Sequence, residues 1–211
     1  MSSSRLPSLY VVTDRTQVAD ANLLPVLEHL IPLGGIMLQL REKDLPTRIL
    51  LEWARTIVSW CRRYQVPFLI NDRVDIAMAT DAHGVHLRES SLPVKKVRQC
   101  VGEHRLIGVS VHSIEEAIQQ EKEGADFVVL GPIYDTPSKR AYGPSLGISV
   151  LEEATLQCHI PIYAIGGIDL SRVEALKKAG AYGVAVISSI FQSDSPGEAV
   201  KNYTTQLGVP I

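Results

Sequence analysis

The sequence has few cysteines, no excess of basic residues and no apolar run long enough to cross a membrane. Its three cysteines, Cys61, Cys100 and Cys158, lie far apart and form no Cys-x-x-Cys pair, so neither a disulfide framework nor a zinc site is expected. The formal net charge of −2 argues against a surface that binds nucleic acid through excess positive charge. Because a signal-peptide core and a membrane span are also lacking, we expect a cytoplasmic protein with no membrane partner.

The chain of 211 residues, 45% of them hydrophobic, is long enough to bury a substantial core as one domain. Short apolar runs alternate along it with longer amphipathic segments. The runs carry apolar residues at successive positions, which indicates strands buried on both faces, as in a parallel sheet. We predict strands at 9–13, 36–40, 68–70, 84–87, 106–111, 127–130, 162–165 and 184–187.

A helical segment follows each predicted strand. Helices are predicted at 22–33, 47–64, 74–80, 92–101, 113–123, 149–156, 171–179 and 197–207, with a short turn before the last one. Ser91 and Ser113 are predicted N-caps, and Glu116 completes a capping box with Ser113. Eight strand–helix units close most simply into a (β/α)₈ TIM barrel, with an open doubly wound sheet as the alternative. We therefore expect residues 1–211 to form a single TIM-barrel domain of the α/β class.

Polar residues gather at the carboxyl ends of these strands, where barrel enzymes carry their active sites. Strand alternation places Gln39, Arg41 and Lys43 on one face. The segment at 134–146 is the one insertion long enough to act as a lid, and it contributes Lys139 and Arg140. Together these basic side chains would form a cluster that suits a di- or polyphosphate better than a single phosphate.

A glycine pair and a serine pair follow the last two predicted strands, between which barrels commonly hold a phosphate group. Gly166 and Gly167 would let backbone N–H groups approach a phosphate, with the next helix adding its dipole. Ser188 and Ser189 would bind the same phosphate from the other side. A plain strand-to-helix turn is the alternative, but we predict a phosphate site and hence a phosphorylated small molecule as ligand.

Two other side chains allow a structural and a functional interpretation. Asp72 either caps the helix that follows it or ligates Mg²⁺, which takes one or two carboxylates together with substrate phosphates and water. His112, which follows Ser110 at the end of a strand, either makes a structural hydrogen bond or carries a proton for the substrate. Their places after predicted strands make both residues candidates for the site.

These motifs, in this order, resemble those of the thiamine phosphate synthase family, which also includes the thiazole tautomerases. The resemblance extends over residues 9–191. The matching stretches are Gln-Leu-Arg-Glu-Lys at 39–43, Ile-Asn-Asp at 70–72, Gly-Val-His-Leu at 84–87, Gly-Val-Ser-Val-His at 108–112, Gly-Pro-Ile-Tyr at 131–134, Thr-Pro-Ser-Lys at 136–139 and Ala-Ile-Gly-Gly-Ile at 164–168.

The resemblance implies a TIM-barrel transferase of thiamine biosynthesis. Such an enzyme couples hydroxymethylpyrimidine diphosphate to thiazole phosphate and releases pyrophosphate with Mg²⁺, and the family suggests a homodimer. By motif, Gln39 and Asn71 would contact the pyrimidine, and Asp72 would bind Mg²⁺. The diphosphate would be held by Arg41, Lys43, Ser110 and Lys139, the thiazole phosphate by Gly166, Gly167, Ser188 and Ser189, and further substrate contacts would come from Thr136 and Ser138.

One segment departs from the family pattern. After the fourth strand the synthases resemble Gly-Gln-x-Asp, whose Asp is the second Mg²⁺ ligand, whereas this chain reads Arg-Glu-Ser-Ser at 88–91. Ser91 therefore stands where that carboxylate is expected. Either Glu89 or water fills the gap, since Mg²⁺ often keeps several waters, or Arg88 points into the site and replaces the charge of the metal.

The same segment, together with His112, looks like the tautomerase branch of the family. There the matching histidine shuttles a proton on a thiazole carboxylate phosphate, without a metal. The retained Asn71, Asp72 and Arg-Glu-Lys of 41–43 favour the synthase instead. A third hypothesis is a regulatory barrel that binds thiazole phosphate without turnover.

Overall fold

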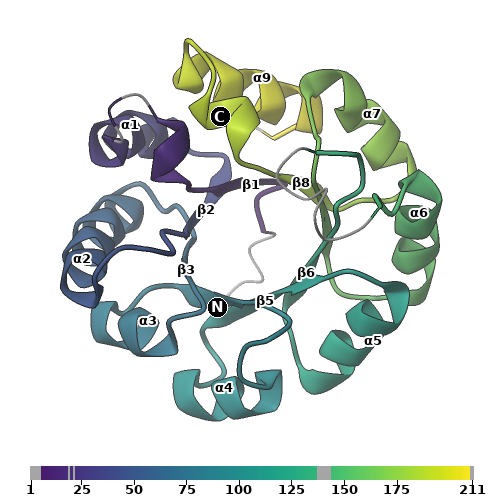
Figure 1. Cartoon of the computed structure of the whole chain (residues 1–211), viewed down its shortest axis with the longest axis horizontal. Helices are drawn as coiled ribbons and strands as arrows, with labels where there is room; N and C mark the ends of the chain where they lie inside the picture. The colour runs from purple at the N-terminus through teal and green to yellow at the C-terminus, as the bar shows by residue number, and fades with distance from the viewer. Residues whose placement is uncertain (1–5, 19, 21, 137–143, 210–211) are drawn as a thin grey trace.

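The computed structural model describes residues 6–18, 20, 22–136 and 144–209. At its centre is a closed barrel of eight parallel strands arranged in chain order, in which β1 pairs with both β2 and β8 (Figure 1). This double pairing confirms the predicted TIM barrel and rules out the open sheet. The strands are β1 (Leu9–Val12), β2 (Ile36–Leu40), β3 (Phe68–Asn71), β4 (Gly84–Leu87), β5 (Leu106–Val111), β6 (Phe127–Leu130), β7 (Ile162–Ile165) and β8 (Gly183–Val186).

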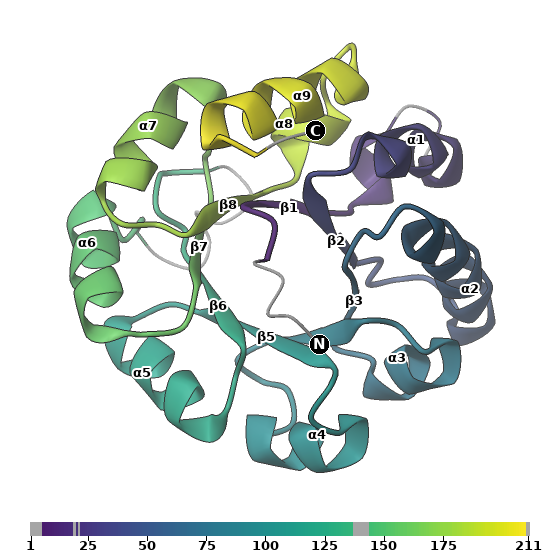
Figure 2. The same ribbon diagram turned by 180° about the vertical axis from the view of Figure 1, so that it is seen from behind.

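Helices form a ring on the outer side of the strands, as the two opposite views show (Figure 2). They are α1 (Leu23–Leu30), α2 (Thr47–Arg63), α3 (Val74–Thr80), α4 (Val94–Val101), α5 (Ile114–Glu123), α6 (Ile148–Gln157), α7 (Leu170–Lys178), α8 (Ser188–Phe191) and α9 (Pro196–Leu207), with the 3-10 turns η1 (Arg15–Gln17) and η3 (Ile31–Leu33). None of these described helices is long and apolar enough to span a bilayer.

The amphipathic pattern of the helices explains how the ring packs on the barrel, and α2 illustrates it. Its buried residues recur at the spacing of one helix face and so form an apolar stripe. They are Leu50, Ala54, Ile57, Val58 and Cys61. These side chains belong to the same buried cluster as the outward-facing side chains of the strands, so burial of this layer holds the ring against the barrel.

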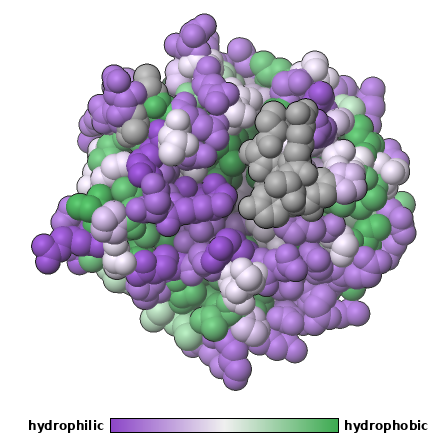
Figure 3. Space-filling model, in the orientation of Figure 1, coloured by the Kyte–Doolittle hydropathy of each residue, from purple (hydrophilic) through white to green (hydrophobic). Residues whose placement is uncertain are grey.

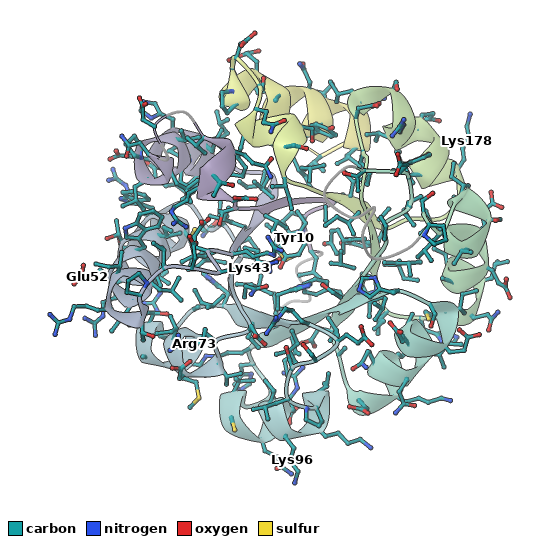
Figure 4. The ribbon with its side chains drawn as sticks, viewed as in Figure 1. Tyr10, Lys43, Glu52, Arg73, Lys96 and Lys178 are labelled. Carbon is teal, nitrogen blue, oxygen red and sulfur yellow. The ribbon has the colours of Figure 1, made fainter. Side chains whose placement is uncertain are left out.

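Aromatic side chains fill the interior of the barrel. Tyr10, Phe127 and Tyr163 are fully buried, and their ring centroids lie 5.4–5.7 Å apart in tilted or edge-on pairs, an arrangement that aromatic rings favour. Figure 4 shows Tyr10 near the middle of the barrel. At the amino-terminal end the Tyr163 hydroxyl donates a 2.7 Å hydrogen bond to the carbonyl of Pro7. This packed interior leaves the carboxyl ends of the strands as the place for a ligand.

Three local predictions differ from the structure. Ser91 is not the N-cap of α4, because Pro93 occupies that position and the helix begins after it. The predicted turn after β8 is the short helix α8, and the predicted helix at 22–33 is divided into α1 and η3, which contains Pro32. The cap at Ser113 is confirmed by a 3.1 Å hydrogen bond from the Glu116 N–H to its hydroxyl.

Gly108 on β5 offers a test of the interior packing. A Cβ atom there would come within 2.2 Å of Phe127 and 2.8 Å of the His86 Nδ1. We expect Gly108→Ala to lower the free energy of unfolding by about 1–3 kcal/mol, because the extra methyl group overpacks the barrel. Urea denaturation measures this change.

The matched control is Gly197→Ala in α9, where a Cβ would first meet Leu33 at 3.9 Å. This variant should leave stability unchanged, or raise it by up to about 1 kcal/mol through helix propensity. Equal effects of the two substitutions would contradict the packing argument.

Candidate active site

A cavity of about 340 Å³ lies at the carboxyl ends of the strands, within the range usual for small-molecule sites. Hydrophilic residues gather around the middle of this face (Figure 3). In Figure 4, Lys43 lies near this middle, whereas Glu52, Lys96 and Lys178 lie on the outer side of the ring. Residues that follow different strands therefore meet at one place although they are far apart in the sequence.

A buried carboxylate joins the ends of β1 and β2. The Thr13 hydroxyl donates to Glu42 at 2.6 Å, and the Arg15 backbone N–H donates to the same carboxylate at 3.1 and 3.2 Å. Burial raises the pKa of Glu42 and outweighs the lowering effect of these hydrogen bonds. The Thr13 oxygen also accepts a hydrogen bond of 2.9 Å from the Arg41 backbone N–H. We call these hydrogen bonds the Thr13–Glu42 latch. They fix the segment that presents Arg41 and Lys43 to the cavity.

Two amide side chains pair across β2 and β3. The Gln39 Nε2 donates to the Asn71 Oδ1 at 2.9 Å, and Gln39 is buried. This bond leaves the carbonyl oxygen of Gln39 and the amino group of Asn71 for other partners. The pair therefore offers one acceptor and one donor to a ligand in the cavity that both residues line.

His86 lies inside the barrel between Tyr10 and Ser110. Its Nε2 is 2.9 Å from the Ser110 hydroxyl, and its Nδ1 is 3.3 Å from the Tyr10 hydroxyl. Burial, helped by the charge of Arg41, lowers the pKa of His86 to about 3. The neutral imidazole has one donor and one acceptor nitrogen, and it orients the Ser110 hydroxyl at the edge of the cavity.

Asp72 is held at the corner between β3 and β4. Its backbone is left-handed, with φ of 61°, and its N–H donates to the His86 carbonyl at 2.8 Å. The Asp72 Oδ1 accepts from the Ser91 hydroxyl, and the Oδ2 accepts from the Arg88 guanidinium through Nη2 and, at 3.1 Å, through Nε. The Arg88 backbone N–H donates to the Ser91 oxygen at 2.8 Å. Of these three side chains it is Arg88 that lines the cavity.

His112 lies at the rim after β5. Its Nδ1 is 2.5 Å from the Gly131 carbonyl oxygen, so this nitrogen donates and the Nε2 of the neutral ring is left as an acceptor. The Glu116 carboxylate accepts a 2.7 Å hydrogen bond from the His112 backbone N–H. These contacts hold the ring at the cavity that it lines.

The turn after β7 requires glycine. Gly166 and Gly167 have φ of 98° and 62°, and a Cβ on Gly166 would lie 2.5 Å from the Pro132 Cβ. Arg172, in the first turn of α7, donates to the Gly167 carbonyl, and its guanidinium carbon lies 4.4 Å from the centroid of the Tyr134 ring. The close approach of Pro132 and the hydrogen bond from Arg172 therefore fix the turn where it meets the cavity.

A family model described as thiamine monophosphate synthase matches residues 9–190. The chain belongs to this family. The thiamine-phosphate synthase of Syntrophomonas wolfei is 41% identical over 92% of this chain and 93% of its own. That of Desulfitobacterium hafniense strain Y51 is 39% identical over 92% and 94%. The structure of the thiamine phosphate pyrophosphorylase from Pyrococcus furiosus is similar, with a TM-score of 0.84, 30% identity and 96% of each chain covered.

Most of the residues predicted for the family site line this one cavity. They are Gln39, Arg41, Lys43, Asn71, Ser110, His112, Thr136, Gly166, Gly167, Ser188 and Ser189. Asp72 lies behind Arg88 instead of lining the cavity. Ser138, Lys139 and Arg140 lie outside the described residues. The individual roles of all these residues in the family reaction stay predictions.

Two residues, one lining the cavity and one next to it, were not predicted from the sequence. Gln17 in η1 lines the cavity, and its buried Oε1 has no hydrogen-bond partner in the described part of the chain. Its Nε2 donates to Asp14 at 2.9 Å. The polar residues that follow β1 in the sequence could therefore have indicated that Gln17 belongs to the site. Arg172 is a cation in the first turn of a helix, where the helix dipole disfavours positive charge. This unusual position could have indicated from the sequence that Arg172 has a specific partner.

The buried His86 predicts a specific dependence of stability on pH. Its folded-state pKa of about 3 lies below the ordinary value of 6.5, so its contribution is present above the unfolded pKa and is lost as the pH falls. Between about pH 7.5 and about pH 5.5, the wild type should lose about 1.4 kcal/mol more stability than His86→Gln. Urea denaturation at both pH values measures the difference. Parallel pH profiles would mean that folded His86 titrates normally.

Proposed function

We propose that this protein is a thiamine phosphate synthase that couples hydroxymethylpyrimidine diphosphate to thiazole phosphate and releases pyrophosphate. The observation that carries the proposal is the cavity itself. Arg41 and Lys43 line it on one side, and the Gly166–Gly167 turn and Ser188 line it on another. Two phosphorylated substrates need two such anion-binding regions in one site. The named relatives and the family match support the same activity.

The amide pair supplies recognition of the pyrimidine. An aminopyrimidine presents an amino donor beside a ring-nitrogen acceptor. The free carbonyl oxygen of Gln39 and the free amino group of Asn71 match these two groups. Their mutual 2.9 Å hydrogen bond fixes the orientation of both amides before the substrate arrives, which reduces the cost of ordering them on binding.

The reaction breaks the bond between the pyrimidine methylene carbon and the diphosphate oxygen. The electron pair stays on that oxygen, and the lone pair of the thiazole nitrogen then forms the new carbon–nitrogen bond. Arg41, Lys43 and Ser110 would stabilise the negative charge that grows on the departing pyrophosphate. The Thr13–Glu42 latch and the His86 contact to Ser110 keep these groups in place, so little reorganisation is needed as the charge develops.

The thiazole phosphate would be bound where the segments after β7 and β8 line the cavity. The positive φ angles of Gly166 and Gly167 shape a turn into which a phosphate can come close to the backbone. Ser188 and Ser189, at the start of α8, add hydroxyl groups, and barrels commonly bind phosphate between these two loops. Thr136 lines the same cavity, and contacts from Ser138 and Lys139 stay part of the proposal.

The residues at the expected magnesium position fit Mg²⁺ poorly. Both oxygens of Asp72 have partners, the Ser91 hydroxyl and the Arg88 guanidinium, and the second carboxylate of the family pattern is Ser91. Glu89 lines the cavity but is exposed. We therefore derive no step of the reaction through Mg²⁺.

The tautomerase hypothesis rests on His112, whose Nε2 is left as an acceptor. The relatives compared above are named for the synthase, so the tautomerase is not favoured. The homodimer, the cytoplasmic location and the single-domain organisation inferred from the sequence stay predictions.

Purified protein given both substrates should release pyrophosphate, measured by a coupled phosphate assay, with and without Mg²⁺. Absence of release under all saturating conditions would reject the proposed function. In that case an assay of the thiazole carboxylate phosphate decides between the alternatives. Turnover that His112→Ala abolishes indicates a tautomerase, and tight thiazole phosphate binding without any turnover indicates a regulatory barrel.

Arg41 allows a quantitative test of the diphosphate contact. We expect Arg41→Gln to lower kcat/KM for pyrophosphate release on the order of 100-fold, the usual effect of removing one group that stabilises developing charge. Steady-state kinetics measure this change. Lys178→Gln removes a positive charge from the outer surface (Figure 4) and should leave kcat/KM unchanged. A similar loss in both variants would mean that overall charge, and not Arg41 itself, matters.

A further inference from the structure

The network of Asp72, Arg88 and Ser91 holds a guanidinium group in a fixed position at this corner of the cavity. The Arg88 guanidinium donates twice to one carboxylate oxygen of Asp72, and charge-assisted pairs of this kind are directional as well as strong. The Ser91 hydroxyl, itself held by the Arg88 N–H at 2.8 Å, takes the other oxygen. Asp72 thus anchors Arg88 through its side chain and, by way of Ser91, through its backbone.

The exposure of the two charges decides which of them a ligand meets. The Arg88 side chain is 52% exposed and the Asp72 side chain is 25% exposed, and Arg88 lines the cavity. An anion that enters the cavity therefore meets the guanidinium, with the carboxylate behind it.

Counted over positions 72, 88 and 91, the formal charge equals that of the family arrangement. Two carboxylates with one Mg²⁺ sum to zero, and so do Asp72 with Arg88. Against the Gly-Gln-x-Asp pattern, this chain has lost one carboxylate at position 91, gained one guanidinium at position 88 and gained one exposed carboxylate at Glu89. A guanidinium also carries several N–H donors in a fixed plane, so it can bind phosphate oxygens while one edge stays on Asp72.

Arg88 also acts together with the cations proposed to hold the diphosphate. Arg41 and Lys43 line the same cavity. Burial holds the pKa of Arg41 below its ordinary value; the charges of Asp14 and Glu42 oppose this shift, and the charge of Arg88 adds to it. Two guanidinium groups that repel each other across a cavity form a favourable place for a multiply charged anion.

We infer that Arg88, anchored by Asp72 and Ser91, takes the place of the divalent cation, so that this protein binds and releases a diphosphate group without Mg²⁺. The inference rests on the proposed function for the identity of the diphosphate substrate. The chemistry balances without a metal. The carbon–oxygen bond breaks, its electron pair stays on pyrophosphate, and Arg88 donates hydrogen bonds to oxygens that become more negative. No proton transfer is required of the protein.

Binding of inorganic pyrophosphate, measured by isothermal titration calorimetry in EDTA and in Mg²⁺, tests the inference apart from activity. The wild type should bind in EDTA at least as tightly as in Mg²⁺. Arg88→Gln should weaken binding in EDTA by about 10–100-fold, the effect of losing a charge-assisted contact, and Arg88→Lys should restore part of it. Lys96→Gln, on the outer side of α4 (Figure 4), is the charge-matched control and should bind as the wild type does.

Wild-type binding that appears only with Mg²⁺, or an Arg88→Gln variant that binds like the wild type, would overturn the inference. Circular dichroism of each variant shows whether it is folded, and Arg88→Lys keeps the test valid if Arg88→Gln fails to fold.

The double variant Arg88→Gly with Ser91→Asp restores the family pattern at both positions. It should gain binding of Mg²⁺ alone, and it should bind pyrophosphate only when Mg²⁺ is present. A double variant that still binds pyrophosphate in EDTA as the wild type does would contradict the exchange of arginine for metal.

The activity assay separates the inference from the proposed function. Pyrophosphate release from the two substrates that persists in EDTA supports both. Release that requires Mg²⁺ leaves the synthase function standing and overturns the role of Arg88. If no release occurs in either buffer but pyrophosphate binds in EDTA and depends on Arg88, the proposed function fails and the arginine site stands.

Discussion

Closure of the barrel through the pairing of β1 with β8 is the constraint on which the site depends. Because all strands are parallel, closure brings their carboxyl ends to one rim, and the register decides which side chains stand next to one another there. Asn71 lies opposite His86, so polar residues at strand ends become neighbours around the cavity. The packed aromatic layer beneath them then supports the rim from inside the barrel.

Two carboxylates near this rim serve as anchors for cations. Glu42 binds Thr13 and the backbone of Arg15, and through Thr13 it fixes the segment of Arg41 and Lys43. Asp72 fixes Arg88 in a comparable way from the next corner. In both cases the acid is less exposed than the cations that it positions: Glu42 is buried whereas Arg41 and Lys43 are not, and Asp72 is less exposed than Arg88. Glu42 and Asp72 therefore hold cations in place, and among the described residues that line the cavity Arg41, Lys43 and Arg88 outnumber the one carboxylate, Glu89.

The sequence was sufficient to predict the barrel because its strands are almost wholly apolar and its helices carry clear apolar stripes. It was sufficient for most of the cavity because strand-end positions converge in any closed barrel. It could not predict which partner a long side chain selects. The sequence did not show whether the Arg88 side chain points into the site, and it led us to expect that Ser91 caps a helix. Only the three-dimensional proximity of Asp72 shows that both side chains bind its carboxylate.

The chain departs from the Gly-Gln-x-Asp pattern at positions 88, 89 and 91, and the departures at 88 and 91 are best understood as one change. With Ser91 but no arginine, Asp72 would be a partly buried carboxylate facing an anionic substrate without a counter-charge, which is costly. With Arg88 and an aspartate at 91, two carboxylates would compete for one guanidinium, and net negative charge would face the diphosphate. Each substitution alone therefore disturbs the balance that the pair restores, and the effects of residues in one such network are not additive. A site that had simply lost its metal ligand would not need a cation in its place.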